Sequence, residues 1–288
     1  MSSPTTFRWI DGGLVAGPGA DGADPAAGRL LVADSWLVDD GLVRALDVHR
    51  DRFADSVAAA LGEAAPTAHP ADGADGADGR LDVDAFWSAA VARLPRTGAW
   101  FPRVELVSGA GRDGRDDGPP ELRLLLRPAP ALTRSVVLAT APHDPRTRPT
   151  VKGPDLRALG RLREDVGPLG ADEAVLLDPD GHVVDGAWSS IVWWRGDALC
   201  LPADDLPRLP GVTARTVLTL AAVLGVDVLH ERATPASLDG FEIWTTSALQ
   251  GIRIVTDWVD GPTPAEQPGR LALWRSRLEA LRRPLADA

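Results

Sequence analysis

Apolar and polar positions in the first part of the chain follow two periods. Alternation with a period of two, broken by Asp-Gly and Pro-rich turns, predicts short strands over 7–15, 29–38, 103–109, 121–128 and 134–140. Apolar side chains at helical spacing predict two helices, over 47–62, where Gly62 supplies a stop, and over 82–94. This order predicts an antiparallel sheet with helices on one face.

After about residue 141 strands and helices alternate more regularly. The pattern predicts helices near 154–165, from Val212 onward and over 265–283, and strands over 172–178, 182–186, 190–194, 198–202, 226–232, 242–247 and 252–258. We therefore expect an N-terminal α+β domain over 1–141 and a C-terminal α/β domain over 142–288. The Ala/Asp/Gly-rich stretch 63–80 cannot bury an apolar face and is predicted to be a surface insertion.

Composition narrows the function classes. The formal net charge of -11 argues against nucleic acid or an anionic membrane as a partner, so an anionic ligand needs a local group of positive charges. No apolar run approaches a membrane span, and the first residues lack the pattern of a secretory signal, so we expect a cytoplasmic location. The single cysteine, Cys200, excludes an internal disulfide and is expected to be a small buried apolar side chain; no metal site is expected.

One residue type is nearly missing from the chain. Lys152 is the only lysine, and every other member of the Lys+Arg total of 30 is arginine. A guanidinium stays protonated, whereas an amine can lose its proton and act as a nucleophile or form a Schiff base. Composition alone leaves open that Lys152 is a surface lysine retained by chance, so its surroundings have to decide.

Three further motifs follow Lys152 in order. The segment 182–190 reads "HVVDGAWSS", 209–218 reads "LPGVTARTVL" and 242–251 reads "EIWTTSALQG". In the second motif Gly211 permits close backbone approach, and Val212 and Thr213 begin a helix whose N–H groups face an anion. By itself this stretch would be only a capped helix.

The ordered set resembles the class IV aminotransferases, the family of branched-chain and D-amino acid aminotransferases and of aminodeoxychorismate lyase. The resemblance covers essentially the whole chain and is densest over 150–255. It implies the two-domain α/β architecture of PLP fold type IV, with pyridoxal 5′-phosphate (PLP) in the cleft between the domains. It also implies that Lys152 carries PLP as a Schiff base, which arginine could not form.

The resemblance assigns the pyridine partner to Asp185. The family has Glu-Gly where this chain has Asp185-Gly186, so the carboxylate that keeps the pyridine nitrogen protonated is one methylene shorter. A strand would have to approach closer, or a water would have to bridge. Without the resemblance, Asp185 would be an ordinary turn aspartate before glycine.

The phosphate is assigned to several segments. The resemblance implies contacts from Gly211, Val212, Thr213, Ser247 and Ala248, and from Arg52 in "DVHRDRF", which matches a His-x-x-Arg segment of the family. Ala214 stands where the family usually has arginine, and Arg215 follows one position later. Alternatively, Arg52 is a solvated helix arginine, and Ser247 and Ala248 belong to a Thr/Ser-rich strand end.

Substrate contacts are the least determined part. Trp188 occupies a position where the family has a small hydroxyl residue, which predicts a large flat group near the cofactor ring or pocket wall. Thr246 precedes Ser247 and is a further candidate. Arg112 and Arg115 fall in a loop where relatives bind the substrate's distal carboxylate, although a solvated hairpin tip is the preferred explanation for both.

The resemblance thus predicts a homodimeric, PLP-dependent aminotransferase acting on an amino acid and a 2-oxo acid. β-Elimination of the aminodeoxychorismate lyase kind is the alternative reaction, since no motif separates the two. A third possibility is a catalytically impaired member that acts as a binding protein, because Asp185, Trp188, Ser190 and Ala214 all depart from the family pattern. The retained lysine argues against that possibility.

Overall fold

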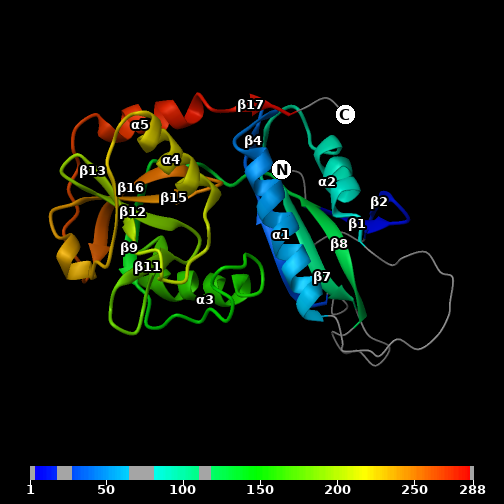
Figure 1. The fold of residues 1–288 in the computed structure, drawn as a ribbon, viewed down its shortest axis with the longest axis horizontal. Helices are drawn as coiled ribbons and strands as arrows, with labels where there is room; N and C mark the ends of the chain where they lie inside the picture. Colours follow the sequence, from blue (N-terminus) through cyan, green and yellow to red (C-terminus); the bar gives the residue numbers. More distant parts are fainter. Residues whose placement is uncertain (1–3, 18–27, 65–80, 110–117, 286–288) are drawn as a thin grey trace. The chain divides into compact units, whose positions relative to one another are not determined.

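The chain folds into two compact units. The computed structural model describes residues 4–17, 28–64, 81–109 and 118–285 (Figure 1). One unit comprises Met1–Ala129 with Arg283–Ala288, and the other comprises Pro130–Arg282. The division lies earlier than the predicted boundary at 141/142, because strand β9 (Ser135–Thr140) pairs in parallel with β10 and β16 of the second unit. The predicted run 134–140 therefore belongs to the second unit.

The first unit contains the predicted antiparallel sheet. Its strands, in spatial order, are β2 (Gly13–Ala16), β1 (Thr5–Ile10), β8 (Gly118–Leu126), β7 (Arg103–Gly109) and β3 (Leu30–Ser35). β1 and β2 are joined at Asp11-Gly12, where both residues have positive φ angles of 48° and 77°. This is the backbone that a two-residue hairpin needs, and it explains the Asp-Gly signal in the sequence.

Aromatic rings join the two helices of this unit, α1 (Leu46–Ala64) and α2 (Val83–Ala92). The ring centres of Phe53 in α1 and Trp87 in α2 are 6.1 Å apart, and those of Trp36 and Trp87 are 4.8 Å apart. α2 starts at its N-cap Asp82, whose side chain accepts a hydrogen bond from the backbone N–H of Ala85. α1 continues two residues beyond the predicted stop at Gly62.

A small antiparallel sheet completes the first unit. It consists of β17 (Arg283–Pro284), β5 (Leu42–Val43), β4 (Val38–Asp39) and β6 (Ala99–Trp100). Leu285 is buried, and its backbone N–H donates to the carbonyl of Gly41. A segment from the far end of the sequence therefore packs into the unit that the first third of the chain forms.

The second unit is built on a mixed sheet of eight strands. In spatial order they are β11 (Val183–Gly186), β10 (Glu173–Leu177), β9, β16 (Gly251–Val259), β15 (Glu242–Ser247), β12 (Ser190–Arg195), β13 (Ala198–Pro202) and β14 (Val228–Glu231). Cys200 on β13 is fully buried, as predicted.

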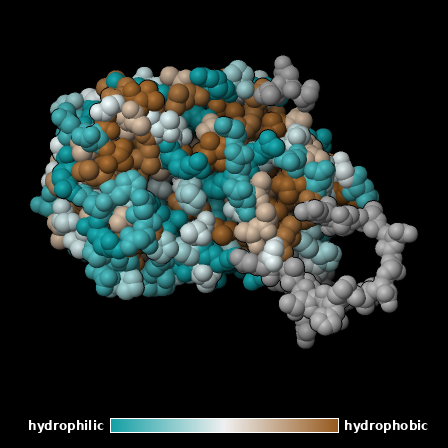
Figure 2. Space-filling model, in the orientation of Figure 1, coloured by the Kyte–Doolittle hydropathy of each residue, from teal (hydrophilic) through white to brown (hydrophobic). Residues whose placement is uncertain are grey.

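Three α-helices pack on this sheet: α3 (Leu156–Val166), α4 (Val212–Val223) and α5 (Arg270–Glu279). In Figure 1, α4 and α5 lie along the upper side of the unit and α3 along its lower side. Trp194, Trp244 and Trp274 form a T-shaped cluster under α4 and α5. Around α3 the visible surface is mainly hydrophilic (Figure 2), and Arg157 and Arg161 of that helix are exposed.

In the described part of the chain, the remaining helical segments are two short 3-10 helices, Gly167–Leu169 and Pro235–Leu238. α5 begins at Arg270 rather than at 265, because Gly269 precedes it in a left-handed conformation with φ of 85°. Among the described residues, no helix has the length and apolar content that crossing a membrane requires.

Candidate active site

Asp185 is a buried carboxylate at the edge of the second unit's sheet. It lies on β11 opposite Leu176 of β10 and is 4% exposed. Burial raises its pKa to about 7, against the opposing effects of the Arg146 charge and of hydrogen bonds from the backbone N–H groups of Leu209 and Gly186. A carboxylate in this state can change its charge near neutral pH when a cation arrives beside it.

Arg146 brings a positive charge close to Asp185. One guanidinium nitrogen, Nη1, lies 3.8 Å from Asp185 Oδ2, and the side chains are 5% and 6% exposed. The rest of the guanidinium is bound to Asp144, with Nε at 2.9 and 3.0 Å from its two carboxylate oxygens and Nη2 at 2.7 Å from Oδ2. Arg146 is thus held tightly on one side and faces Asp185 across a longer gap on the other.

Lys152 lies in the same loop, between β9 and α3, and is half-buried. The loop is fastened by the buried Asp155, which accepts hydrogen bonds from the Thr147 hydroxyl at 2.8 Å and the Arg148 backbone N–H at 3.0 Å. α3 begins at Leu156, four residues after the lysine. Lys152 therefore lies in a loop that hydrogen bonds to Asp155 hold in place, and Arg146 of the same loop contacts Asp185.

The predicted anion-binding turn adjoins the end of β12. A Cβ on Gly211 would lie 2.7 Å from the Ser190 hydroxyl oxygen, so a larger residue there would displace the Ser190 side chain from its present position. Ser190 pairs with Thr246 of β15, and the Thr246 hydroxyl is buried with no hydrogen-bond partner in the described part of the chain. Gly211 is the N-cap of α4, and Val212 and Thr213 are its first, buried residues.

Ser247 and Ala248 follow Thr246 where β15 turns into β16. Ser247 is half-buried, and its hydroxyl oxygen accepts a hydrogen bond from the Gln250 backbone N–H at 3.1 Å. The structure therefore joins the second and third motifs through Ser190, Gly211 and Thr246. It joins Asp185 to the same turn through the Leu209 backbone N–H.

Trp188 packs on α3. The Arg163 guanidinium lies 4.4 Å from the centre of its ring, and the side chain is 51% exposed. The backbone N–H of Trp188 donates to Glu173, a fully buried carboxylate whose pKa is raised by that burial and which also accepts from the Ser189 hydroxyl. These contacts fix the turn that follows Asp185-Gly186 and leave part of the Trp188 ring accessible.

Arg52 lies in the first unit, where it forms a buried ion pair. Its Nε and Nη2 donate to the two oxygens of Asp34 at 2.7 and 2.8 Å, and His49 Nδ1 lies 2.7 Å from Asp34 Oδ1. Burial alone would raise the pKa of Asp34, but the charges of His49 and Arg52 outweigh it and hold this pKa well below its ordinary value. Arg52 is therefore oriented by Asp34 and is not a solvated helix arginine.

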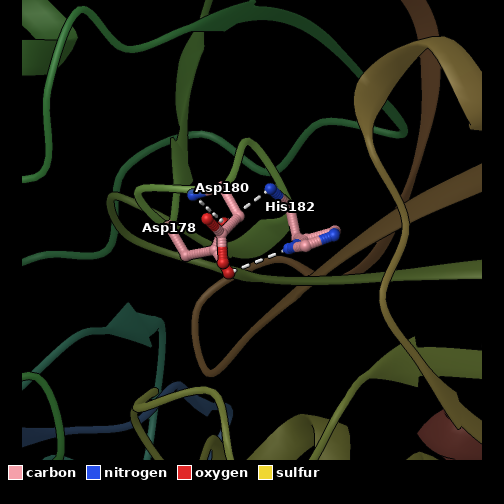
Figure 3. Close-up of side chains that lie close together, drawn as sticks. All are labelled: Asp178, Asp180 and His182. Carbon is pink, nitrogen blue, oxygen red and sulfur yellow. Dashed lines mark hydrogen bonds and ion pairs between the residues drawn. The ribbon is translucent and has the colours of Figure 1, made fainter.

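A group of possible metal ligands lies in the turn between β10 and β11. Asp178, Asp180 and His182 approach one another within 4.8 Å (Figure 3). Both oxygens of Asp178 already accept hydrogen bonds from this turn, Oδ1 from the backbone N–H groups of Asp180 and His182 and Oδ2 from the His182 ring at 2.9 Å. This arrangement is that of an aspartate stabilising a hairpin turn.

Arg112 and Arg115, which were predicted to contact the substrate, lie outside the described residues.

Comparison with known families decides the membership of the chain. Residues 31–258 match the family model described as amino-transferase class IV. The chain belongs to the class IV aminotransferases. The resemblance noted in the sequence is confirmed, and Lys152, Asp185, Gly211 and Thr246 all lie within the part that matches this family.

Curated class IV aminotransferases are similar over shorter stretches. The branched-chain-amino-acid aminotransferase of Pseudomonas aeruginosa is 34% identical over 88 residues, 31% of this chain and 28% of that protein. A putative branched-chain-amino-acid aminotransferase of Methanocaldococcus jannaschii is 29% identical over 134 residues, 44% of this chain and 46% of that protein. The chain matches less than half the length of either relative.

Solved structures confirm the expected fold over nearly the whole length. The T.th. branched-chain amino acid aminotransferase with pyridoxamine 5′-phosphate has a TM-score of 0.77 at 18% identity, covering 98% of this chain and 95% of that one. A fold IV-transaminase from Curtobacterium pusillum has a TM-score of 0.73 at 18% identity, covering 97% and 98%. A PLP-bound hypothetical aminotransferase of Mycobacterium tuberculosis also has a TM-score of 0.73 at 18% identity, covering 96% and 98%.

Sequence reasoning missed the residues that support the predicted ones in this class IV aminotransferase. Asp34, Arg146 and Glu173 are charged residues with buried side chains, each paired with a partner distant in sequence, and each lies in a stretch without a motif. For Glu173 a signal was present, since a charged residue opens an otherwise apolar strand. For Asp34 and Arg146 the sequence offers no local signal, because both partners become neighbours only through folding.

Proposed function

We propose that this protein is a PLP-dependent aminotransferase that moves an amino group between an amino acid and a 2-oxo acid. The single observation that carries the proposal is the position of the only lysine. Lys152 lies in a loop stapled by Asp155, and that loop also places Arg146 beside the buried carboxylate of Asp185. Family membership and the names of the relatives support the same activity.

The residues of the second unit fit the chemistry of PLP. Donors for a phosphate come from the N–H groups at the start of α4, beside the space left by Gly211. The Thr246 hydroxyl, which has no partner among the described residues, is another. Ser247 and Ala248 at the end of β15 extend this group of donors. In the first unit Arg52, oriented by Asp34, is a further candidate for phosphate binding.

Asp185 is the candidate partner of the pyridine nitrogen, with Gly186 allowing the following turn to close. A buried carboxylate whose pKa is about 7 becomes fully ionised when a protonated ring nitrogen lies against it, and by linkage it holds the proton on that nitrogen. When bound, PLP supplies an electron sink for the bonds at the α-carbon of the substrate. Aspartate, although one methylene shorter, can thus supply the same negative charge to the ring nitrogen as the family's glutamate.

Lys152 is the candidate catalytic residue. Its primary amine anchors the cofactor covalently, a role that arginine cannot take. With the cofactor and an amino acid bound, the Lys152 amine would be the group that takes the proton from the substrate α-carbon as general base and returns it as general acid. The hydrogen bonds from Thr147 and Arg148 to Asp155 restrain the backbone of the loop that carries Lys152. A restrained backbone favours one position of the Lys152 amine, as proton transfer requires.

Substrate choice is proposed to depend on the residues around these two groups. Trp188 offers a partly exposed aromatic ring beside the Asp185-Gly186 turn, and Thr246 lies next to the proposed phosphate donors. Arg112 and Arg115 stay candidates for a distal carboxylate. The relatives are named for branched-chain amino acids, so leucine with 2-oxoglutarate is the first substrate pair to test.

The test starts with the absorbance spectrum of the purified protein incubated with PLP. Borohydride reduction followed by peptide mass spectrometry should place the cofactor on the peptide that contains Lys152. Addition of leucine should convert the bound PLP to the pyridoxamine form, and 2-oxoglutarate should restore it. Lys152→Arg preserves the charge and serves as the matched control, in which both signals are lost.

Two results would overturn the aminotransferase assignment. Absence of borohydride labelling in a folded wild-type protein would exclude the covalent role of Lys152. Release of pyruvate from aminodeoxychorismate without an oxo-acid acceptor, and without formation of the pyridoxamine form, would assign the lyase reaction instead.

Two further predictions concern the assembly and the location of the protein. We propose a homodimer, because relatives of this family place residues of both subunits near each site, and light scattering of the purified protein tests it. We also propose a cytoplasmic location from the sequence, which localisation of a tagged protein tests.

A further inference from the structure

The ion pair between Arg146 and Asp185 is unusual in its geometry. The Arg146 side chain is as buried as the carboxylate, yet its closest approach to Asp185 is 3.8 Å, whereas its contacts to Asp144 are between 2.7 and 3.0 Å. A direct hydrogen-bonded pair would have a separation of about 2.8 Å. The Asp144 carboxylate therefore holds the guanidinium close to Asp185 without letting it make a hydrogen bond there.

We propose that Arg146, restrained by Asp144, is a positioning residue that stabilises the ionised form of Asp185 while leaving its carboxylate available to a ring nitrogen. The inference rests on the proposed function for the identity of that nitrogen. The coupling between the two side chains does not depend on it.

Electrostatics around Asp185 support this assignment. The facing groups are Arg146 from the loop after β9, Arg208 and the Leu209 N–H from the loop before α4, and the N–H of Gly186. An acidic neighbour is Glu173 on β10, whose Cγ would lie 3.5 Å from a Cβ at Gly186. Among the groups that lower the pKa of Asp185, Arg146 has the largest effect.

The distance also has a functional reason. A guanidinium bonded directly to Asp185 would occupy an oxygen that a pyridine N–H needs and would compete with it. A guanidinium held slightly farther away still stabilises the anion by its charge, because attraction in a buried site falls slowly with distance. Asp144 thus prevents Arg146 from competing with a pyridine N–H for the Asp185 carboxylate, while the Arg146 charge still stabilises the Asp185 anion.

The experiment follows the unfolding of the apo protein in urea between pH 5 and pH 9. In the wild type, unfolding free energy should fall with rising pH and level off near pH 7, where buried Asp185 ionises. Arg146→Met should move that levelling point up by about one pH unit or more. Arg146→Lys, which keeps the charge, should leave the levelling point close to its wild-type pH. Asp144→Asn, which releases the guanidinium, should move the levelling point to lower pH.

The decisive comparison uses Asp185→Asn as background. In that background Arg146→Met should leave the shape of the pH dependence unchanged, because the group it acts on has been removed. An equal shift with and without Asp185, or no shift at all, would overturn the inference. If Arg146→Met does not fold, the pair Arg146→Lys and Asp144→Asn still tests the sign of the effect.

A second readout links the inference to the cofactor. The dissociation constant of PLP at pH 8 should rise several-fold in Arg146→Met and should not rise further when Asp185→Asn is already present. If the wild type binds no PLP, the proposed function fails, whereas the apo titration still judges the Arg146–Asp185 coupling. The two failures are therefore distinguishable.

Discussion

Replacing Asp34 by asparagine should destabilise the first unit strongly. Asp34 is completely buried and accepts two hydrogen bonds from Arg52, at 2.7 and 2.8 Å, with His49 Nδ1 at 2.7 Å. Opposite charges at that separation attract by about 6 kcal/mol at an effective dielectric constant of about 20. Asp34→Asn keeps the shape but leaves the Arg52 charge buried without its counterion. Because removing one partner of a buried pair costs roughly 3–5 kcal/mol, we expect a loss in this range at pH 7.

The assay is urea unfolding followed by tryptophan fluorescence, since Trp36 and Trp87 report on the packing of this unit. The matched control is Asp84→Asn, which removes an exposed carboxylate paired with Arg50 at 2.8 Å, and should barely move the unfolding midpoint.

The pH dependence gives a second check on Asp34. Because the pKa of Asp34 is lowered in the folded protein, its stabilisation is fully present above its ordinary pKa of 3.8 and is lost as pH falls through the folded value. The contribution of the Asp34–Arg52 pair to the difference between wild type and Asp34→Asn should therefore be fully present throughout the range from pH 8 to pH 5. Equal midpoints at pH 7, or a difference that disappears within that range, would refute the reasoning.

Two other substitutions test the second unit. A folded pKa of about 7 for Asp185, against an ordinary 3.8, means that the folded protein keeps a proton that the unfolded chain has lost, so unfolding free energy should fall by about 4 kcal/mol as pH rises between these values. Asp185→Asn should remove this contribution and leave the smaller slope of other buried carboxyls such as Glu173, whose pKa is also raised by burial. An unchanged slope would contradict the burial argument. Gly186→Ala would place a Cβ 2.8 Å from the Ser189 carbonyl oxygen and should cost roughly 1–3 kcal/mol in urea unfolding, whereas Gly167→Ala, with nothing within 4 Å, should be neutral or slightly stabilising. Equal midpoints for the two alanine variants would show that the turn after Gly186 adjusts freely.

Much of the fold could be predicted because its elements have local causes. The Asp11-Gly12 turn, the cap at Asp82 and the apolar run along β12 are each visible in a few consecutive letters. The membership of β9 could not be predicted, because its partners β10 and β16 lie about 35 and 120 residues later and parallel pairing leaves no mark on the strand itself. For the same reason the predicted boundary at 141/142 differs from the division between the two compact units.

In the candidate site, too, some residues could be recognised from the sequence and others only from the fold. The position of Lys152, the glycine at 211 and the aspartate at 185 are marked by residue type, because amine chemistry, close backbone approach and charge each need a particular side chain. The residues that tune them are not so marked. Arg146 is one arginine among many until folding brings it within 3.8 Å of Asp185, and the exposure of Trp188 depends on how α3 packs.

The segment 283–285 has a consequence for how the protein is made. Its pairing with β5 and the burial of Leu285 close a unit whose other strands all come from the first 129 residues. During translation the small sheet of this unit therefore keeps one edge unpaired until the second unit and the segment after it have been synthesised. Chaperone demand and the tolerance of this chain to shortening near Arg283 should both reflect that delay.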